Sequence, residues 1–325
     1  MKYPLRRAIR AIVLLFGVSV LCFLFTEMAP GSFFDEMRLN PQISPETVSA
    51  LRARYGLDRP LIMRYGQWLT SVAQGDLGFS IAYNAPVAPL LWDRARNTLL
   101  LTTTAMVLTW LIGVPLGVWS AAYRGRWLDR VVETGNSLLI SIPEIVIALG
   151  LLALAVRVRL VPIGGMMSID HEDLSAWAKL QDVLRHLLLP TAILVLAGIS
   201  VVIRHVRASV GEVLDAPYLR AGRGLGIGQA RLLFRHALPV AASPAISLFG
   251  FSIASLLSGS LLVEVVTGWP GLGPLLLEAT LARDLYLVIG GIIFSALFLL
   301  AGNFIADLLL LASDPRIRTG GLDAQ

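Results

Sequence analysis

Long apolar segments separated by polar loops dominate the sequence. A helix that crosses a bilayer needs roughly 20 apolar residues, and six segments meet this requirement to within a few residues at each end. Prolines inside them, such as Pro115 and Pro143, are tolerated where neighbouring groups satisfy the freed carbonyls. The pattern predicts an all-α polytopic membrane protein with six transmembrane helices. The expected spans are about Ala8–Met28, Thr98–Ala122, Val131–Val156, Leu187–Ile203, Ala241–Val263 and Leu285–Ala312.

Arginines in the loops orient these spans. Short cytoplasmic loops carry an excess of Lys and Arg, and the turn holding Arg124, Arg126 and Arg130 follows this rule most clearly. Both termini are therefore expected in the cytoplasm, and the first span is interpreted as an uncleaved anchor. The expected organisation is a cytoplasmic N-terminus with the first span (1–28), an extracytoplasmic helical loop (29–96), a core of five spans (97–312) with a cytoplasmic loop (209–240), and a cytoplasmic tail (313–325).

Composition supports a membrane protein and narrows its chemistry. The 325 residues are 56% hydrophobic and 15% charged, with a mean hydropathy of +0.72, whereas soluble domains carry about 25% charged residues. The net charge of +5 comes from arginines that follow membrane topology, so a nucleic-acid partner is not expected. The one cysteine, Cys22, lies in the first span, which excludes an internal disulfide and a Cys-based metal site.

The loop at 29–96 is expected to be structured. Ser44 followed by Pro45 is a helix start, with Gly56 as its C-cap, and a second helix runs from about Leu61 to Gly75. The faces expected to be buried consist of Val48, Leu51 and Tyr55 in the first helix, and Leu61, Tyr65, Trp68, Leu69 and Val72 in the second. The loop is either a structural cap on the outer leaflet or a landing surface for an extracytoplasmic partner.

The most polar stretch between spans is Gly211–Val240. Leu214–Ala221 can form a short helix, the alternating glycines that follow allow a sharp turn, and Gln229–Leu238 can form a second helix. In that second helix Arg231 and Arg235 lie on one side, four residues apart. The predicted product is an amphipathic element on the cytoplasmic face that fits a groove of another protein; an ordinary amphipathic loop on the lipid surface is the alternative.

This stretch also carries a family signature. Gly226 is followed after nine residues by His236-Ala237-Leu238-Pro239, and Tyr218-Leu219-Arg220-Ala221-Gly222-Arg223-Gly224-Leu225 precedes it. Further short motifs that carry the same family pattern occur along the chain. They are Ala29-Pro30-Gly31, Arg54 to Pro60, Gly75 to Gly78, Ser141-Ile142-Pro143, Gly268 to Gly273 and Asp314 to Arg318. On these residues the chain resembles the permease subunits of ATP-binding-cassette importers, in the dipeptide/oligopeptide branch. It departs from the branch pattern at Ala221, Leu225 and Glu144.

The resemblance implies a subunit that forms half of a path for di- or oligopeptides in the bacterial inner membrane. It implies a second homologous permease, two ATPase subunits that bind ATP and Mg²⁺, a solute-binding protein, and surrounding lipid; nickel, opines or oligosaccharides are alternative solutes. No cofactor is expected in this chain. The residues expected to contact the ATPase are Asp215, Tyr218, Arg220, Gly222, Arg223, Gly224, Gly226, Arg235, His236, Leu238 and Pro239.

Polar and small residues inside the spans indicate a path for solute. Ser252, Ser255 and Gly259 form one helical stripe, although tight helix packing selects the same residue types. Asn303, Asp307 and Glu144 lie at membrane depth, where ionisable groups are functional candidates. Glu144 is interpreted either as a site for a peptide amino terminus or as a protonated group in a packed interface. An outer gate or binding-protein contact is predicted at Glu264, Trp269, Pro270 and Gly271.

Catalysis is not expected of this chain. It contains no Gly-x-x-x-x-Gly-Lys-Ser/Thr sequence, so nucleotide hydrolysis is assigned to a partner. A membrane-embedded enzyme would need a nucleophile and base, or paired acids, at one depth, and no such set is evident. A gradient-driven transporter would favour an internal repeat, and none is found. The run Asp170 to Asp173 is interpreted as a solvated surface rather than a metal site.

Overall fold

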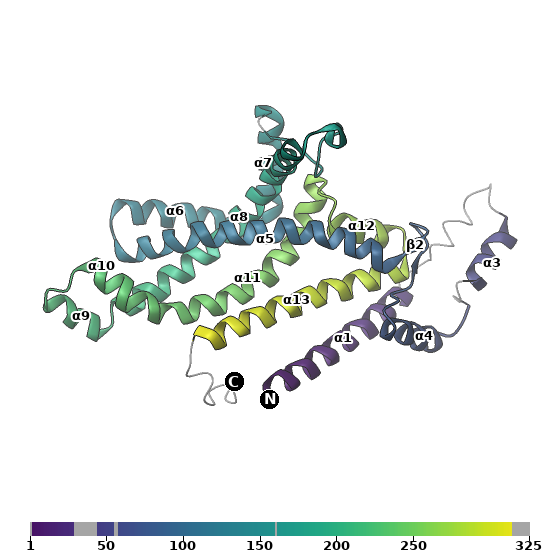
Figure 1. The fold of residues 1–325 in the computed structure, drawn as a ribbon, viewed down its shortest axis with the longest axis horizontal. Coiled ribbons are helices and arrows are strands. Elements are labelled where there is room, and N and C mark those ends of the chain that lie inside the picture. The colour runs from purple at the N-terminus through teal and green to yellow at the C-terminus, as the bar shows by residue number, and fades with distance from the viewer. Residues whose placement is uncertain (1, 29–43, 55–57, 160, 314–325) are drawn as a thin grey trace. The chain divides into compact units, whose positions relative to one another are not determined.

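A computed structural model describes residues 2–28, 44–54, 58–159 and 161–313, which are almost entirely helical (Figure 1). Helices are expected here because backbone groups in lipid must be hydrogen-bonded within their own segment. Over the described ranges, the only strands are the antiparallel pair β1 (Phe79–Ser80) and β2 (Ala85–Pro86). Contacts group these residues into two units. Unit one comprises 1–97 and 271–300, and unit two comprises 98–270 and 301–325.

Five of the six predicted spans fall on a single helix each and the third falls on two, but not all six are long and apolar enough to cross a bilayer by themselves. Four described helices meet that condition, and a bent pair treated below makes a fifth. The apolar part of α1 (Lys2–Met28) is shorter, at Ile9–Phe25. The four are α5 (Val87–Ala122), α8 (Ala176–Leu214), the run Gln229–Thr267, and Leu285–Ile305 within α13 (Leu285–Ser313). The count of six membrane-spanning helices and the cytoplasmic location of both termini remain predictions.

The third predicted span is not one straight helix, which corrects the expectation for Val131–Val156. It consists of α6 (Trp127–Ser141) and α7 (Glu144–Val158), whose axes differ by 103°. Pro143 lacks a backbone N–H and disfavours helical geometry at the residue before it. Ile142 accordingly adopts an extended conformation, with φ −97° and ψ 123°. Proline within the second span, at Pro115, is accommodated inside α5 as predicted.

The fourth span is much longer than predicted. Hydropathy marks only Leu187–Ile203, whereas α8 continues for 39 residues through polar turns at both ends. Its start is fixed by Ser175, whose side chain accepts a hydrogen bond from the Ala178 N–H at 3.4 Å. Hydropathy identifies only the part of a helix that is apolar enough to lie in lipid, so it does not detect polar helical extensions beyond the bilayer.

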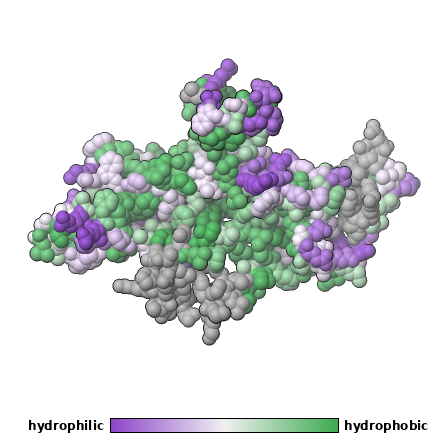
Figure 2. Space-filling model, viewed as in Figure 1, coloured by the Kyte–Doolittle hydropathy of each residue, from purple (hydrophilic) through white to green (hydrophobic). Residues whose placement is uncertain are grey.

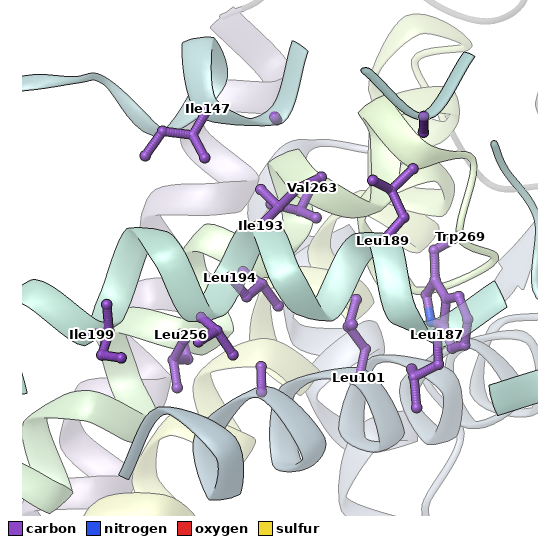
Figure 3. Packing of buried hydrophobic residues seen from close by; sticks show 14 of the residues in the cluster. Leu101, Ile147, Leu187, Leu189, Ile193, Leu194, Ile199, Leu256, Val263 and Trp269 are labelled. Carbon is purple, nitrogen blue, oxygen red and sulfur yellow. The ribbon is translucent and has the colours of Figure 1, made fainter. Parts of the chain in front are cut away.

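The core of unit two is built around α8. Leu187, Ile193 and Leu194 of this helix are buried, and they pack with residues of α5, α7 and α11 (Leu238–Thr267) (Figure 3). Small residues allow the close approach: a Cβ added at Gly117 of α5 would lie 2.9 Å from the Ile203 carbonyl oxygen. Such packing drives helix association where lipid removes the hydrophobic difference. The neighbours of α8 shown in the core are Leu101, Ile147, Leu256, Val263 and Trp269.

Unit one contains the predicted outer loop, whose described residues form two helices as expected. The helix α3 (Pro45–Arg54) begins at Ser44, whose Oγ accepts the Thr47 N–H at 3.2 Å, and Val48 is buried. The predicted closing residues Tyr55 and Gly56 lie outside the described residues. The second helix is α4 (Leu61–Ala73).

One face of α4 packs as predicted. Trp68 is buried with Phe23 of α1 and Ile289 of α13, and its Nε1 donates to the Leu77 carbonyl at 3.2 Å. Leu69 was expected to be buried but is 39% exposed, and Arg64 is buried instead. The side chain of an arginine can bury its apolar stem along a helix surface, which hydrophobic spacing does not reveal.

Polar contacts hold the end of the outer loop to the start of α13. Asp284 accepts hydrogen bonds from Ser80 Oγ at 2.6 Å and from the Ala82 N–H at 3.0 Å. Tyr83 donates its hydroxyl proton to Glu278 of α12 (Leu272–Leu281). Burial, together with this carboxylate, raises the pKa of Tyr83 to about 12. Tyr83 therefore remains a protonated donor throughout the physiological pH range.

Candidate functional site

The segment predicted to contact the ATPase contains one separate short helix, whereas the sequence predicts two. The first helix is α9 (Pro217–Gly224), which starts three residues later than Leu214 because α8 itself runs through Leu214. Pro217 is well suited to the first helical turn, since its missing N–H would have no partner there. The turn after α9 uses Gly226, whose φ of +81° is a left-handed conformation that side chains disfavour.

The second predicted helix, Gln229–Leu238, is not a separate element. The α10 segment (Gln229–Arg231), the π-helical turn η2 (Leu232–Ala237) and α11 form one continuous helical run to Thr267. A π-helical turn adds a residue to the helix without breaking it. The sequence predicts that this helix ends at Leu238 and that the next span begins at about Ala241, whereas the helix continues through Pro239 directly after the π-helical turn. A displacement of this segment would therefore pass directly into α11.

We call 209–240 the coupling segment. Its inner face is anchored, because Leu219 of α9 and Leu232 and Leu233 of η2 are buried in a cluster with the C-terminal end of α8. A Cβ at Gly222 would lie 3.0 Å from Leu232 Cδ2, so Gly222 permits this close packing. The α8 residues of the cluster are Val202, Val206, Val210 and Leu214.

The outer face of the coupling segment displays large apolar side chains. Tyr218 is 53% exposed, Leu225 83% and Phe234 67%. Hydrophilic residues also gather where α9 and α10 lie (Figure 2). The residues predicted to contact the ATPase differ in their exposure. Gly222 is buried and Leu238 is half-buried, whereas the others are exposed. The exposed ones are Asp215, Tyr218, Arg220, Arg223, Gly224, Gly226, Arg235, His236 and Pro239.

Hydrogen bonds tie the coupling segment to the turn between α5 and α6. Gln229 donates to the Ala122 carbonyl at 2.9 Å, and Arg124 approaches Asp215 at 3.5 Å. Arg223 donates to the Leu214 carbonyl at the end of α8, at 3.2 Å. The segment is therefore held against two neighbouring elements of unit two and is not a free loop.

A buried ion pair near this turn was missed by sequence reasoning. Arg207 of α8 binds Asp129 of α6 through Nε at 2.9 Å and Nη2 at 3.1 Å. Ser120 and the Gly125 N–H also donate to Asp129, and Arg207 reaches Glu133 at 3.2 Å. The topology prediction for this turn rests on its arginines alone. A lone acidic residue in a positively charged turn near the membrane was a usable signal, because burying it requires a partner.

Four of the five residues predicted for the solute path are brought together. Glu144 of α7 faces the small stripe of α11, and its Oε1 lies 2.8 Å from the position of a Cβ at Gly259. Glu144, Ser252, Ser255 and Gly259 line one cavity of about 90 Å³. Asn303 lies half-buried on α13 and is not among the residues lining this cavity.

The predicted outer gate lies at the end of α11. Glu264 and Trp269 are fully buried, and the Trp269 N–H donates to the Glu264 carbonyl at 2.9 Å. Gly268 takes a φ of +62° to turn the chain. Pro270 is half-buried and Gly271 buried. In this arrangement the two large side chains pack inside unit two, so a gating role would require them to move.

The acidic run Asp170 to Asp173 forms local pairs. His171 Nδ1 lies 2.7 Å from Asp182 Oδ2, and Lys179 lies 3.4 Å from Glu172. Asp182 also accepts the Ser168 N–H at 2.9 Å. Among the residues whose positions are described, no group of three His, Cys, Asp or Glu side chains has an arrangement that could hold a metal ion.

A bundle of apolar helices with an anchored polar loop between two of its spans defines a multi-pass membrane protein. Comparison with known proteins identifies its family. Residues 113–319 match the model of the binding-protein-dependent transport system inner membrane component, and residues 1–102 match the N-terminal model of the same kind of protein. The chain therefore belongs to the family of binding-protein-dependent transport system inner membrane components.

Individual relatives agree over nearly the whole length. The chain is 34% identical to the oligopeptide transport system permease protein AppB of Bacillus subtilis (strain 168), covering 97% of this chain and 98% of AppB. It is 33% identical to the glutathione transport system permease protein GsiC of Escherichia coli (strain K12), covering 98% and 99%. These relatives confirm the predicted family, the permease subunits of ATP-binding-cassette importers, and its peptide branch.

A solved structure supports the fold. The chain is similar to a chain of the MetNI methionine ABC transporter in an inward-facing conformation, with a TM-score of 0.56 and 18% identity. The match covers 69% of this chain and 96% of that chain. The two share a membrane permease fold.

Proposed function

We propose that this chain forms half of a translocation path for peptides in the bacterial inner membrane. The relatives named above are oligopeptide and glutathione permeases, which supports a peptide solute. In this proposal a second homologous permease completes the path, and a solute-binding protein delivers peptide from outside. Two ATPase subunits bind ATP and Mg²⁺ on the cytoplasmic side, since this sequence carries no phosphate-binding loop of its own.

The observation that carries the proposal is the coupling segment, which is anchored on one face and on the other exposes large apolar side chains among charged ones. Tyr218, Leu225 and Phe234 expose large side chains, and such surfaces favour contact with another protein. Their backbone is held by the packed cluster of Leu219, Leu232 and the end of α8. A rigid element seated in a partner transmits displacement instead of absorbing it.

The force has a direct route into the membrane helices. The coupling segment is continuous with α11 through η2, and it packs on α8. The Arg207–Asp129 pair then ties α8 to α6. A displacement of α9 by the ATPase would therefore move α8, α11 and α6 together, and α8 and α11 line the cavity that holds Glu144.

Gly226→Val tests the coupling role. Valine at a φ of +81° is strained by roughly 1–2 kcal/mol, which should reshape the turn and reduce both ATPase co-purification and peptide uptake at least tenfold. Gly75→Val is the matched control, because Gly75 has a φ of +86° and, like Gly226, nothing within 4 Å of an added Cβ. It should leave ATPase co-purification unchanged. Normal co-purification and uptake by Gly226→Val would refute the coupling role.

The alternative solutes are nickel, opines and oligosaccharides. Growth of a strain that lacks this gene, on a panel of peptides as sole nitrogen source, distinguishes peptide transport from transport of these other solutes. Loss of growth on peptides, restored by the gene, supports the peptide function. Unchanged growth on every peptide, together with loss of uptake of one of the other solutes, would redirect the proposal to that solute.

A further inference from the structure

The cavity next to Glu144 lies at the meeting point of four helices of unit two. It is lined by α5, α7, α8 and α11, near the middle of the two long helices α8 and α11. Of the residues that line it, Glu144 alone carries a charged side chain, and the rest of the lining is apolar or hydroxyl-bearing. A pocket that is mostly apolar with a few converging polar groups is typical of a ligand site.

The Glu144 carboxylate makes no hydrogen bond or ion pair with another residue in the described part of the chain. It lies against Gly259, where an added Cβ would stand 2.8 Å from Oε1 and 3.0 Å from Oε2. Its position follows from the bend at Pro143, which starts α7 at this residue and turns it toward α11. A carboxylate partly removed from water gains from a cationic partner, and no other lining residue supplies one.

Three hydroxyl groups line the same cavity. Thr109 of α5 is 1% exposed, and its Oγ1 has no hydrogen-bond partner in the described residues. Ser252 donates to the Leu248 carbonyl at 2.9 Å, so its oxygen lone pairs remain able to accept. Ser255 is exposed on the same helical stripe. An unsatisfied buried hydroxyl is costly, and a ligand donor would relieve that cost for Thr109.

The donor and acceptor pattern selects one kind of ligand. An ammonium group carries a positive charge and three N–H donors, which match one carboxylate and the hydroxyl oxygens around it. An anionic group would meet the carboxylate unfavourably. A Ca²⁺ ion would need six to eight oxygen ligands, more than this cavity provides. About 90 Å³ has room for the end of a solute and not for a whole peptide.

We propose that this cavity receives the terminal ammonium group of a solute as it crosses the membrane, with Glu144 as the charge partner and Thr109, Ser252 and Ser255 as acceptors. The inference deepens the proposed peptide function and rests on it. Glu144 then selects solutes with a free amino terminus inside the path. A solute with a blocked amino terminus forms no ion pair there.

The test uses the purified permease complex with its ATPase subunits and one solute-binding protein, reconstituted in liposomes. Uptake of labelled tri-alanine is compared with that of N-acetyl-tri-alanine. The wild-type complex should prefer the free peptide at least tenfold. Glu144→Gln keeps the side-chain shape without the charge and should lower that preference at least fivefold, while N-acetyl-tri-alanine uptake changes less than twofold. Any preference imposed by the binding protein is common to both complexes.

A second variant tests the same geometry without changing Glu144. Gly259→Ala places a methyl group where the carboxylate lies, and because a glutamate side chain is flexible, the carboxylate is displaced while the helices stay packed. This variant should lower the preference as Glu144→Gln does. Gly150→Ala on α7 is the control, because nothing lies within 4 Å of an added Cβ there, and it should keep the wild-type preference.

Each outcome is decisive. Loss of preference in both Glu144→Gln and Gly259→Ala, with Gly150→Ala normal, supports the ammonium site. Unchanged preference in Glu144→Gln overturns it and assigns Glu144 to helix packing. Equal uptake of the two peptides by the wild-type complex overturns the ammonium site and leaves the peptide function standing. Uptake of neither peptide by the wild-type complex counts against the peptide function and this inference together.

Discussion

Two carboxylates of the bent α6–α7 pair occupy opposite environments. Asp129 near the start of α6 is 3% exposed, and it is saturated by Arg207, Ser120 and the Gly125 N–H. Glu144 at the start of α7 faces a cavity and has no such partners among the described residues. Removal of a charge from water is costly, and charged partners offset that cost. We infer that Asp129 joins helices, whereas Glu144 is available to a ligand.

In the function proposed above, the two carboxylates also stand at different points between the coupling segment and the solute path. The Asp129 cluster links α5, α6 and α8 beside the coupling segment. The Glu144 cavity lies near the middle of the long helices, where a path must change shape. An ion pair whose groups are fully hydrogen-bonded resists separation of the helices that carry it. An unpaired carboxylate beside a glycine offers no such resistance. Substitutions at the two sites should therefore differ in kind, with stability affected at the first and solute preference at the second.

The largest effect is expected for Arg207→Ala. It leaves Asp129 buried without its charge partner, which should lower the free energy of unfolding by about 3–5 kcal/mol. The measurement is denaturant unfolding of the purified chain in detergent micelles. Glu133→Gln is the control, because Glu133 is 56% exposed in its contact with Arg207, and pairs that open to solvent contribute about 0–1 kcal/mol. Equal stability of the two variants would refute the joining role of Asp129.

A smaller effect is expected for Ser120→Ala. The substitution removes one donor to Asp129 while Arg207 and the Gly125 N–H remain, so the loss should be about 1–2 kcal/mol. The same unfolding assay measures it. Ser141→Ala is the matched truncation, since Ser141 is exposed and, within the described ranges, its hydroxyl bonds only the Ser137 carbonyl, at 2.8 Å; it should cost less than about 0.5 kcal/mol. A Ser120→Ala protein as stable as Ser141→Ala would show that Arg207 alone satisfies Asp129.

The smallest stability effect is expected for Glu144→Gln. No partner is lost, and removal of a carboxylate from the first turn of α7 costs about 0.3–1 kcal/mol through the helix dipole. Relief of desolvation opposes that loss, so the free energy of unfolding should change by less than about 1 kcal/mol. The unfolding assay is again used, alongside the uptake assay described above. A loss as large as that of Arg207→Ala would place Glu144 with Asp129 as a packing group.

The sequence identified much of the fold because membrane segments follow simple rules. The positions of the six apolar segments, the structured loop with α3 and α4, and the coupling segment were all found from apolar length, caps and polar spacing. The bend at Pro143 and the full length of α8 were not found. A proline permits a kink but does not require one, and hydropathy is silent on helix that continues outside the lipid.

The candidate site divides in the same way. The stripe of Ser252, Ser255 and Gly259 was visible as helical spacing, and Glu144 as an ionisable residue at membrane depth. Their convergence on one cavity was not visible, because it depends on the turn of α7 at Pro143. Thr109 gave no signal at all, since a threonine in an apolar helix is ordinary. The pairing of Asp129 with Arg207 joins residues of two helices that are distant in sequence.

The sequence by itself determined the membrane character and the location of the coupling segment, because these depend on composition and on local spacing, and its motifs carried the resemblance that indicated the family. The tertiary structure alone decided whether Asp129 and Glu144 are each paired with another side chain or face a cavity. Local rules place a side chain on the face of its own helix, but the partner of a buried charge is chosen by how helices pack. For this chain, that packing satisfies Asp129 and leaves Glu144 facing a cavity.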